Sequence, residues 1–389
     1  MTHTSQAQDR WNAYVMPTYG TPKVVLDHGV GARVWDVDGK EYIDFVAGIA
    51  VNLLGHAHPV LIDAVTKQLT TLGHTSNLAA HEPGLQLAQK LVELVGGNAK
   101  VFFTNSGTEA NEAAIKLSRL TGKTHIVALR NSFHGRTIGS LTMTGQPKKY
   151  EPFLPLMPDV SFVDANDVDG LRDAITDKTA ALWLEPIQGE GGVLPLTQEF
   201  MTTARELCTQ HEAMLVLDEV QTGIARTGSW FAYQQFNVMP DVLLLAKGLG
   251  AGIPIGACIG FGKFADLMTA GLHGTTFGGN AVSCAAGNAV LQEVEDSNLI
   301  KRALEIETAI KILEELPGVE QVRGMGAMLG IVLTSEVAND VESRARELGL
   351  LVNACNSSVL RLVPPLVVTD DDLAGAIDIL TQAISEISS

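Results

Sequence analysis

The chain has 389 residues, of which 46% are hydrophobic and 38 are glycine, and its formal net charge is −17. This length favours two domains, and the hydrophobic content is sufficient for a large core, which excludes a disordered chain. The acidic balance argues against nucleic-acid binding, because a phosphate backbone attracts basic surfaces.

The sequence shows neither a targeting signal nor a membrane span. The first ten residues contain no apolar signal region, and the most apolar stretch, 248–262, is rich in glycine and interrupted by Pro254. The four cysteines are far apart and form no C-x-x-C pair, which is typical of reduced, mostly buried thiols inside a cell. We therefore expect a cytoplasmic protein that binds neither membranes nor nucleic acids.

Secondary-structure signals begin with a hairpin and then alternate. Asp38-Gly39 between alternating apolar residues predicts a hairpin within residues 24–46, and helical patterns follow at 59–72 and 84–95. Apolar runs then predict seven strands, near 101–104, 125–129, 160–163, 180–184, 213–218, 241–246 and 256–261. Helical patterns fill the gaps, near 108–120, 136–143, 168–176, 198–210 and 229–236. This alternation predicts an α/β fold with a mostly parallel seven-stranded sheet covered by helices on both faces.

The expected domain organisation follows from a change of pattern near residue 278. A long helical region over 281–314 precedes a shorter set of strands and helices. We expect a large α/β domain over 60–275 and a smaller α+β domain over 276–389. The segment 1–59 could pack with either domain, and we expect its hairpin to pack on the smaller one.

Lys247 ends an apolar run and precedes a glycine-rich stretch. A lysine at the carboxyl end of a buried strand would lie in the crevice where open α/β sheets bind ligands. Burial there would lower its pKa and make the amine a nucleophile able to form a Schiff base. For this stretch alone, an ordinary lysine that reaches solvent from a strand end explains the pattern equally well.

A second pattern, Ser106-Gly107-Thr108, follows another apolar strand and begins a helix. The free N–H groups and the partial positive charge of a helix N-terminus suit a phosphate. Glycine permits close approach of the backbone, and the two hydroxyls can add donors. An ordinary helix cap, with Glu109 and Glu112 in the first turn, is the alternative.

Two further strand ends carry residues that could contact a ligand. Phe133 and Arg136 follow the strand at 125–129 and could supply a stacking face and a carboxylate fork. His134 lies between them, and its neighbours define no catalytic role, so we interpret it as structural. Glu190 lies in a glycine-rich loop after the strand at 180–184 and could serve as a movable carboxylate.

The carboxylate pair Asp218-Glu219 ends a buried strand and has two interpretations. One is the metal-holding acid of a nucleotide hydrolase, and the other is an aspartate facing the ring nitrogen of a cofactor. The hydrolase needs a G-x-x-x-x-G-K-[ST] loop. The one Gly-Lys-Thr, at 122–124, has Leu117 where the first glycine must stand, so the hydrolase interpretation fails at its most specific requirement. We also expect no metal site, since His56-Ala-His58 has no further ligands nearby.

A phosphate cradle, an aromatic face, a ring-nitrogen aspartate and a Schiff-base lysine are the parts that a pyridoxal phosphate site requires. The chain resembles the class III aminotransferases of fold type I, essentially from end to end. The resemblance rests on 106–112, 133–137, 185–190, 218–223, 246–248, 275–280 and 361–366. Within this family, the segment 48–56 and the short length are most similar to the acetylornithine aminotransferases.

The resemblance implies a site for pyridoxal phosphate. Lys247 would hold it covalently, and Asp218 would pair with its ring nitrogen. The other cofactor contacts would be Ser106, Gly107 and Thr108 at the phosphate, Phe133 and Val220 on the ring faces, Gln221 at the phenolic oxygen, Glu219 beside the aspartate, and Thr276 from the other subunit of a homodimer.

The resemblance also implies the substrates. The terminal amino group of N2-acetyl-L-ornithine would pass reversibly to 2-oxoglutarate, giving N-acetyl-L-glutamate 5-semialdehyde and L-glutamate in arginine biosynthesis. Arg136 would bind the carboxylate of acetylornithine, and Glu190 would cover Arg361 until glutamate or 2-oxoglutarate binds there. Thr275 stands where the family more often has serine and would contact the substrate. Ornithine, succinylornithine, succinyldiaminopimelate and 4-aminobutyrate are alternative donors. A phosphate-binding protein without catalysis and a nucleotide hydrolase are the alternatives outside the family.

Overall fold

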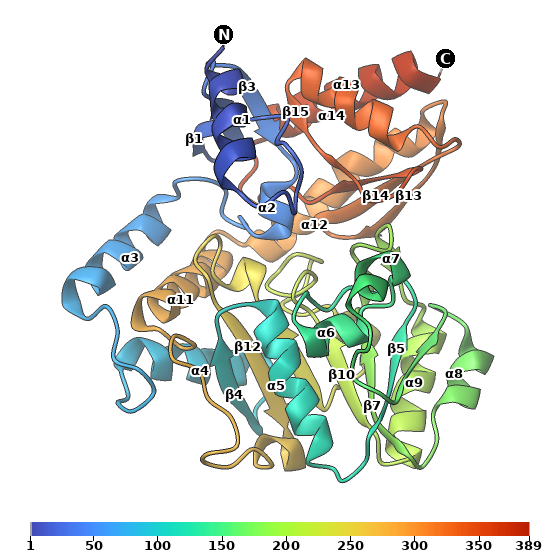
Figure 1. The fold of residues 1–389 in the computed structure, drawn as a ribbon. Coiled ribbons are helices and arrows are strands. Elements are labelled where there is room, and N and C mark those ends of the chain that lie inside the picture. Colours follow the sequence, from blue (N-terminus) through green and yellow to red (C-terminus); the bar gives the residue numbers. More distant parts are fainter. Residues whose placement is uncertain (1, 389) are drawn as a thin grey trace.

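A seven-stranded sheet organises the larger part of the computed structural model, which describes residues 2–388 (Figure 1). Its strands are β4 (Ala99–Thr104), β5 (His125–Leu129), β6 (Val160–Val163), β7 (Thr179–Leu184), β10 (Met214–Asp218), β11 (Val242–Leu245) and β12 (Gly256–Phe261). They lie in the order β4-β12-β11-β10-β7-β5-β6, and only β12 runs antiparallel to its neighbours. The seven predicted strands are confirmed, each within two residues of its predicted bounds.

The sheet has an apolar interior because helices cover both of its faces. Every residue of β7, β10 and β11 is buried, which is why these strands are nearly continuous apolar runs. The covering helices are α5 (Gly107–Arg119), α6 (Ile138–Met143), α8 (Val168–Ala174), α9 (Gln198–Gln210) and α10 (Tyr233–Phe236). The mixed α/β fold of type I is therefore confirmed.

One predicted helix, 229–236, is shorter than expected. Only α10, four residues long, is helical there, and residues 219–232 form turns. The carboxylate of Glu219 accepts hydrogen bonds from the N–H groups of Ala232 (2.6 Å) and Tyr233 (2.8 Å), so the helix begins at that point. The apolar pattern alone does not reveal this long-range cap.

The smaller part of the molecule is built from residues near both ends of the chain. The C-terminal sheet has the order β13 (Val319–Met325), β14 (Met328–Leu333), β17 (Val359–Leu362) and β16 (Asn353–Ala354). The helices of this part are α1 (His3–Tyr14), α2 (Ala47–Ala50), α13 (Ala338–Leu348) and α14 (Asp370–Ser388). Figure 1 draws α1 and α14 together above the large sheet.

The amino-terminal hairpin pairs with the C-terminal part. The turn at Asp38-Gly39 connects β2 (Arg33–Asp36) to β3 (Glu41–Asp44), and the unpredicted strand β1 (Leu26–Val30) extends the sheet. On its other edge, β3 pairs in parallel with β15 (Leu350–Leu351). Backbone hydrogen bonds thus connect segments about 300 residues apart in sequence.

Four helices lie beside the large sheet and connect the two parts. They are α3 (Pro59–Thr71), α4 (Glu82–Leu94), α11 (Ala281–Asp296) and α12 (Leu299–Ile310). Although α11 follows the boundary expected at residue 275, it packs against α3 and α4. None of the helices in residues 2–388 is both long and apolar enough to cross a membrane.

Candidate active site

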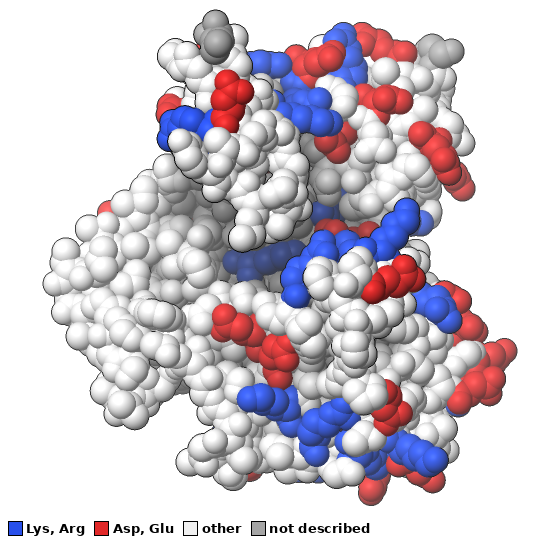
Figure 2. All heavy atoms as spheres, in the orientation of Figure 1, with Lys and Arg blue, Asp and Glu red and all other residues white. Residues whose placement is uncertain are grey.

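The carboxyl ends of the sheet strands border a pocket of about 430 Å³. Parallel strands bring the loops that follow them to one edge of the sheet, and ligands bind there. Ten of the residues predicted for the site line this pocket: Ser106, Gly107, Thr108, Phe133, Arg136, Glu190, Asp218, Val220, Gln221 and Lys247. Figure 2 shows lysine and arginine side chains gathered in the hollow between the two parts of the molecule. This concentration of positive charge in a chain of net charge −17 suits anionic substrates.

Lys247 directly follows β11 and opens a short 3₁₀ turn. Its backbone has a φ of 43°, a left-handed conformation that is rare for a lysine and typical of functional sites. Burial lowers its pKa to about 8, and the nearby positive charge of Arg361 acts in the same direction. Within residues 2–388 its amine makes no hydrogen bond or ion pair. Lys247 is therefore a lysine whose neutral, nucleophilic form is accessible near neutral pH.

Ser106 begins α5 as its N-cap, and its hydroxyl accepts a hydrogen bond from the N–H of Glu109 (3.3 Å). Gly107 and Thr108 line the pocket, and their backbone N–H groups have no acceptor in the described part of the chain. A Cβ on Gly107 would lie 2.8 Å from Val220, so only glycine fits there. The helix cap is confirmed, and the phosphate site stays a prediction that is compatible with it, because the capped helix also has free donors.

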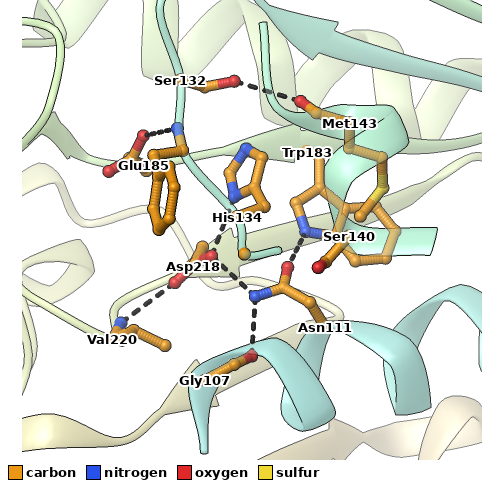
Figure 3. Close-up of polar contacts among 12 residues, drawn as sticks. Gly107, Asn111, Ser132, His134, Ser140, Met143, Trp183, Glu185, Asp218 and Val220 are labelled. Atoms are coloured by element: carbon orange, nitrogen blue, oxygen red, sulfur yellow. Dashed lines mark hydrogen bonds and ion pairs between the residues drawn. The ribbon is translucent and has the colours of Figure 1, made fainter. Parts of the chain in front are cut away.

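Asp218 is held by three hydrogen bonds at the end of β10 (Figure 3). One carboxylate oxygen accepts from Asn111 Nδ2 (2.9 Å) and His134 Nδ1 (2.8 Å), and the other from the N–H of Val220 (3.1 Å). Asn111 is itself fixed, since Trp183 donates to its oxygen (2.7 Å). These bonds fix the orientation of the carboxylate.

Sequence reasoning missed Asn111 and understated His134. His134 is 2% exposed and is a structural histidine in the sense that it orients Asp218. Asn111 reaches Asp218 from the second turn of α5, and its amide also donates to the carbonyl of Gly107 (2.9 Å). The signal for Asn111 was a polar residue on an otherwise apolar buried face of α5.

Glu219, predicted among the cofactor contacts, is not among the residues that line the pocket. Successive side chains at a strand end point in opposite directions, so Glu219 faces away from the side that Asp218 faces. Its carboxylate accepts from Ala232, Tyr233 and the hydroxyl of Thr222 (3.1 Å). Burial raises its pKa to about 7. Glu219 caps α10 and makes no contact with the cofactor pocket.

Glu190 and Arg361 form an ion pair of 2.9 Å beside the pocket. Arg361 lies in β17, is 1% exposed, and also donates to Asn353 (2.7 Å) and Gln221 (3.3 Å). Burial alone would raise the pKa of Glu190, but Arg361 and Lys149 outweigh it and hold that pKa below its ordinary value. A buried arginine is therefore neutralised by a carboxylate on a loop.

Arg136 is exposed at the pocket and makes no ion pair within residues 2–388. Its guanidinium carbon lies 5.6 Å from the ring centroid of Phe133. The hydroxyl of Thr275 accepts from Asn105 (3.3 Å), which lines the pocket, although Thr275 itself does not. Thr276 is exposed and lies outside the pocket of its own chain. Arg136 is thus a cation available to a substrate.

The residues around the pocket fit pyridoxal phosphate. Free N–H groups at the start of α5 suit its phosphate, the oriented carboxylate of Asp218 suits a protonated ring nitrogen, and the buried amine of Lys247 suits its aldehyde. Val220 and Phe133 provide apolar surface in the same pocket. The fold and the site define a pyridoxal-phosphate-dependent aminotransferase.

Comparison with known proteins identifies the family. The family model described as "Aminotransferase class-III" matches residues 14–384, and the chain belongs to this family. It is 54% identical over 376 residues to the acetylornithine aminotransferase of Mycolicibacterium smegmatis, covering 96% of each chain. It is 52% identical to that of Streptomyces coelicolor, covering 93% of this chain and 91% of the relative.

Solved structures of related enzymes share the fold. The N-acetylornithine aminotransferase of Stenotrophomonas maltophilia superposes with a TM-score of 0.84 at 37% identity, covering 97% of this chain and 98% of the other. The ornithine aminotransferase of Toxoplasma gondii superposes with a TM-score of 0.95 at 32% identity, covering 99% and 95%. The predicted family, fold, enzyme class and cofactor are confirmed.

Proposed function

We propose that the protein transfers the terminal amino group of N2-acetyl-L-ornithine to 2-oxoglutarate. The observation that carries the proposal is the ion pair between Glu190 and Arg361 beside the unpaired Arg136. This arrangement offers one cation to a substrate and keeps a second one covered. The relatives that are about half identical to the chain are named for the same donor, which supports the proposal.

The two substrates present different charges to the pocket. The carboxylate of acetylornithine is far from the reacting amine, so one distant cation is sufficient, and Arg136 supplies it. Glutamate and 2-oxoglutarate carry two carboxylates and require a second cation, which Arg361 supplies once Glu190 moves away. Bidentate arginine–carboxylate bonds make both contacts directional as well as attractive. Glu190 thereby decides how many cations the pocket presents.

The chain's own residues then hold and move protons. Bound pyridoxal phosphate withdraws electrons from the amine-bearing carbon of the substrate and so acidifies its C–H bond. Lys247 Nζ accepts that proton and later returns one, since a pKa of about 8 lets the amine exchange protons near neutral pH. Asp218, fixed by Asn111 and His134, holds its carboxylate in place for the ring nitrogen of the cofactor.

We also propose a homodimer, supported by apolar side chains left in solvent. Helix α3 has no buried residue, and Ile62 and Leu69 on it are 49% and 63% exposed. Such a surface is typical of a subunit interface, and a partner's Thr276 would then reach the phosphate. Sedimentation at the protomer mass of 41.4 kDa would contradict the dimer.

We also propose a cytoplasmic location, supported by four free cysteines, and cell fractionation tests it.

Steady-state kinetics with three donors tests the proposed substrate. We expect kcat/KM for acetylornithine to exceed that for ornithine and for 4-aminobutyrate by about tenfold or more, which corresponds to about 1.4 kcal/mol. The free α-ammonium of ornithine would be repelled by Arg136, which lines the pocket, and the acetyl group removes that charge. A preference for ornithine or 4-aminobutyrate would assign the enzyme to another donor.

A further inference from the structure

Lys149 is a second cation in contact with Glu190. It lies in α7 (Pro147–Tyr150), and its amine is 3.3 Å from Glu190 Oε2. The other oxygen, Oε1, is the one that pairs with Arg361 at 2.9 Å. Glu190 therefore bridges two cations, with one oxygen on each. Figure 2 shows basic side chains over the region where Figure 1 draws α7, at the rim of the hollow.

The two cations differ in their surroundings. Arg361 is 1% exposed, whereas Lys149 is 21% exposed and also lies 4.6 Å from the ring centroid of Phe133. Lys149 does not line the pocket in the part of the chain that the structure describes, whereas Glu190 does. Lys149 is thus placed to act on Glu190 and not directly on a substrate.

A dicarboxylate that binds Arg361 must separate Glu190 from it. Removing one partner of a buried ion pair is costly, because the remaining charge stays poorly solvated. The cost for Glu190 would be smaller if a cation that already contacts it donated hydrogen bonds to both of its carboxylate oxygens. Lys149 meets this condition, since it touches Glu190 before the separation and lies closer to solvent.

We propose that Lys149 is a specificity-determining residue, which holds Glu190 after it leaves Arg361 and so favours binding of the dicarboxylate substrate. This inference rests on the proposed exchange between Glu190 and Arg361. A contact shifts such an equilibrium only by its difference between the two states. In the state where Glu190 covers Arg361, one of its oxygens contacts Arg361 and the other contacts Lys149. In the state where Arg361 binds the dicarboxylate, both oxygens of Glu190 would contact Lys149.

The test is the variant Lys149→Met, with Lys148→Met as the matched control. Lys148 precedes it in α7, is exposed, and makes no ion pair within residues 2–388. The probe is glutarate, a dicarboxylate with no amino or keto group to react, titrated into the holoenzyme by calorimetry. We expect Lys149→Met to raise the Kd of glutarate about fivefold and Lys148→Met to leave it within about twofold. An unchanged or lowered Kd in Lys149→Met would overturn the proposal.

A double-mutant cycle with Glu190→Gln shows whether Lys149 acts through Glu190. In the Glu190→Gln background, we expect Lys149→Met to change the Kd of glutarate by less than about twofold. A full effect in that background would mean that Lys149 attracts the ligand itself, which would overturn the assigned role. Glutarate binding does not depend on the amino donor. If acetylornithine is not the donor, the expected Kd values for glutarate are unchanged. If the Kd values contradict the role of Lys149, the preference for acetylornithine is unaffected.

Discussion

Replacing Lys247 with alanine is expected to lower turnover by at least about 10⁴-fold, the upper range for loss of a general acid–base group. The substitution removes the amine that binds the cofactor and the base that moves the proton. No other amine is available to replace it, because Lys247 is the only lysine among the residues that line the pocket within the described chain. Turnover of acetylornithine with 2-oxoglutarate measures the effect.

Borohydride reduction provides a second measurement on the same variant. Reduction should fix pyridoxal phosphate covalently to the wild-type chain and not to Lys247→Ala. Lys263→Ala is the control, since Lys263 is exposed after β12 and outside the pocket. Covalent labelling of Lys247→Ala, or turnover within about tenfold of wild type, would contradict the role of Lys247.

Asp218→Asn should lower kcat by about 10²–10³-fold, as expected for loss of a preorganised electrostatic contact. An amide is nearly the same size as a carboxylate but carries no charge for a protonated ring nitrogen. The amide also cannot make all three hydrogen bonds of Asp218, because its NH₂ group would point at another donor, either the N–H of Val220 or the donors of Asn111 and His134. The cofactor content of the variant must be measured, so that kcat is expressed per occupied site.

Glu219→Gln is the matched control for Asp218→Asn. Glu219 is the adjacent buried carboxylate, but its bonds go to the start of α10. We expect this variant to lose stability, by about 1–3 kcal/mol for an imperfect buried hydrogen bond. Its kcat per occupied site should stay within about threefold of wild type, far from the loss expected for Asp218→Asn. Equal losses in the two variants would mean that Asp218 acts only through the fold.

The fold was predictable because the sheet is buried on both faces. Strands such as β10 and β11 are nearly continuous apolar runs, and their ends are marked by Asp218 and Lys247. Local signals of this kind place a residue at a strand end, and the parallel arrangement then places strand ends together. For this reason the pocket contains most of the residues expected from the sequence.

The remaining features depend on contacts that local patterns do not encode. The turns over 219–232 follow from the bonds of Glu219 to Ala232 and Tyr233, and α11 packs backward on α3 and α4 across the expected boundary. Asn111 and His134 contact Asp218 from residues about 100 positions away. Lys149 has no local signal, because a second lysine in a short helix is indistinguishable from Lys148 until the partner is known.

The measurement that tests the central claim most directly is the ratio of two specificity constants in Glu190→Ala. If Glu190 covers Arg361 in the presence of a monocarboxylate donor, its removal leaves Arg361 permanently free for an α-carboxylate. The account predicts that kcat/KM for glutamate rises relative to kcat/KM for acetylornithine by about tenfold or more, which corresponds to about 1.4 kcal/mol. A ratio equal to that of the wild-type enzyme would contradict the exchange between Glu190 and Arg361.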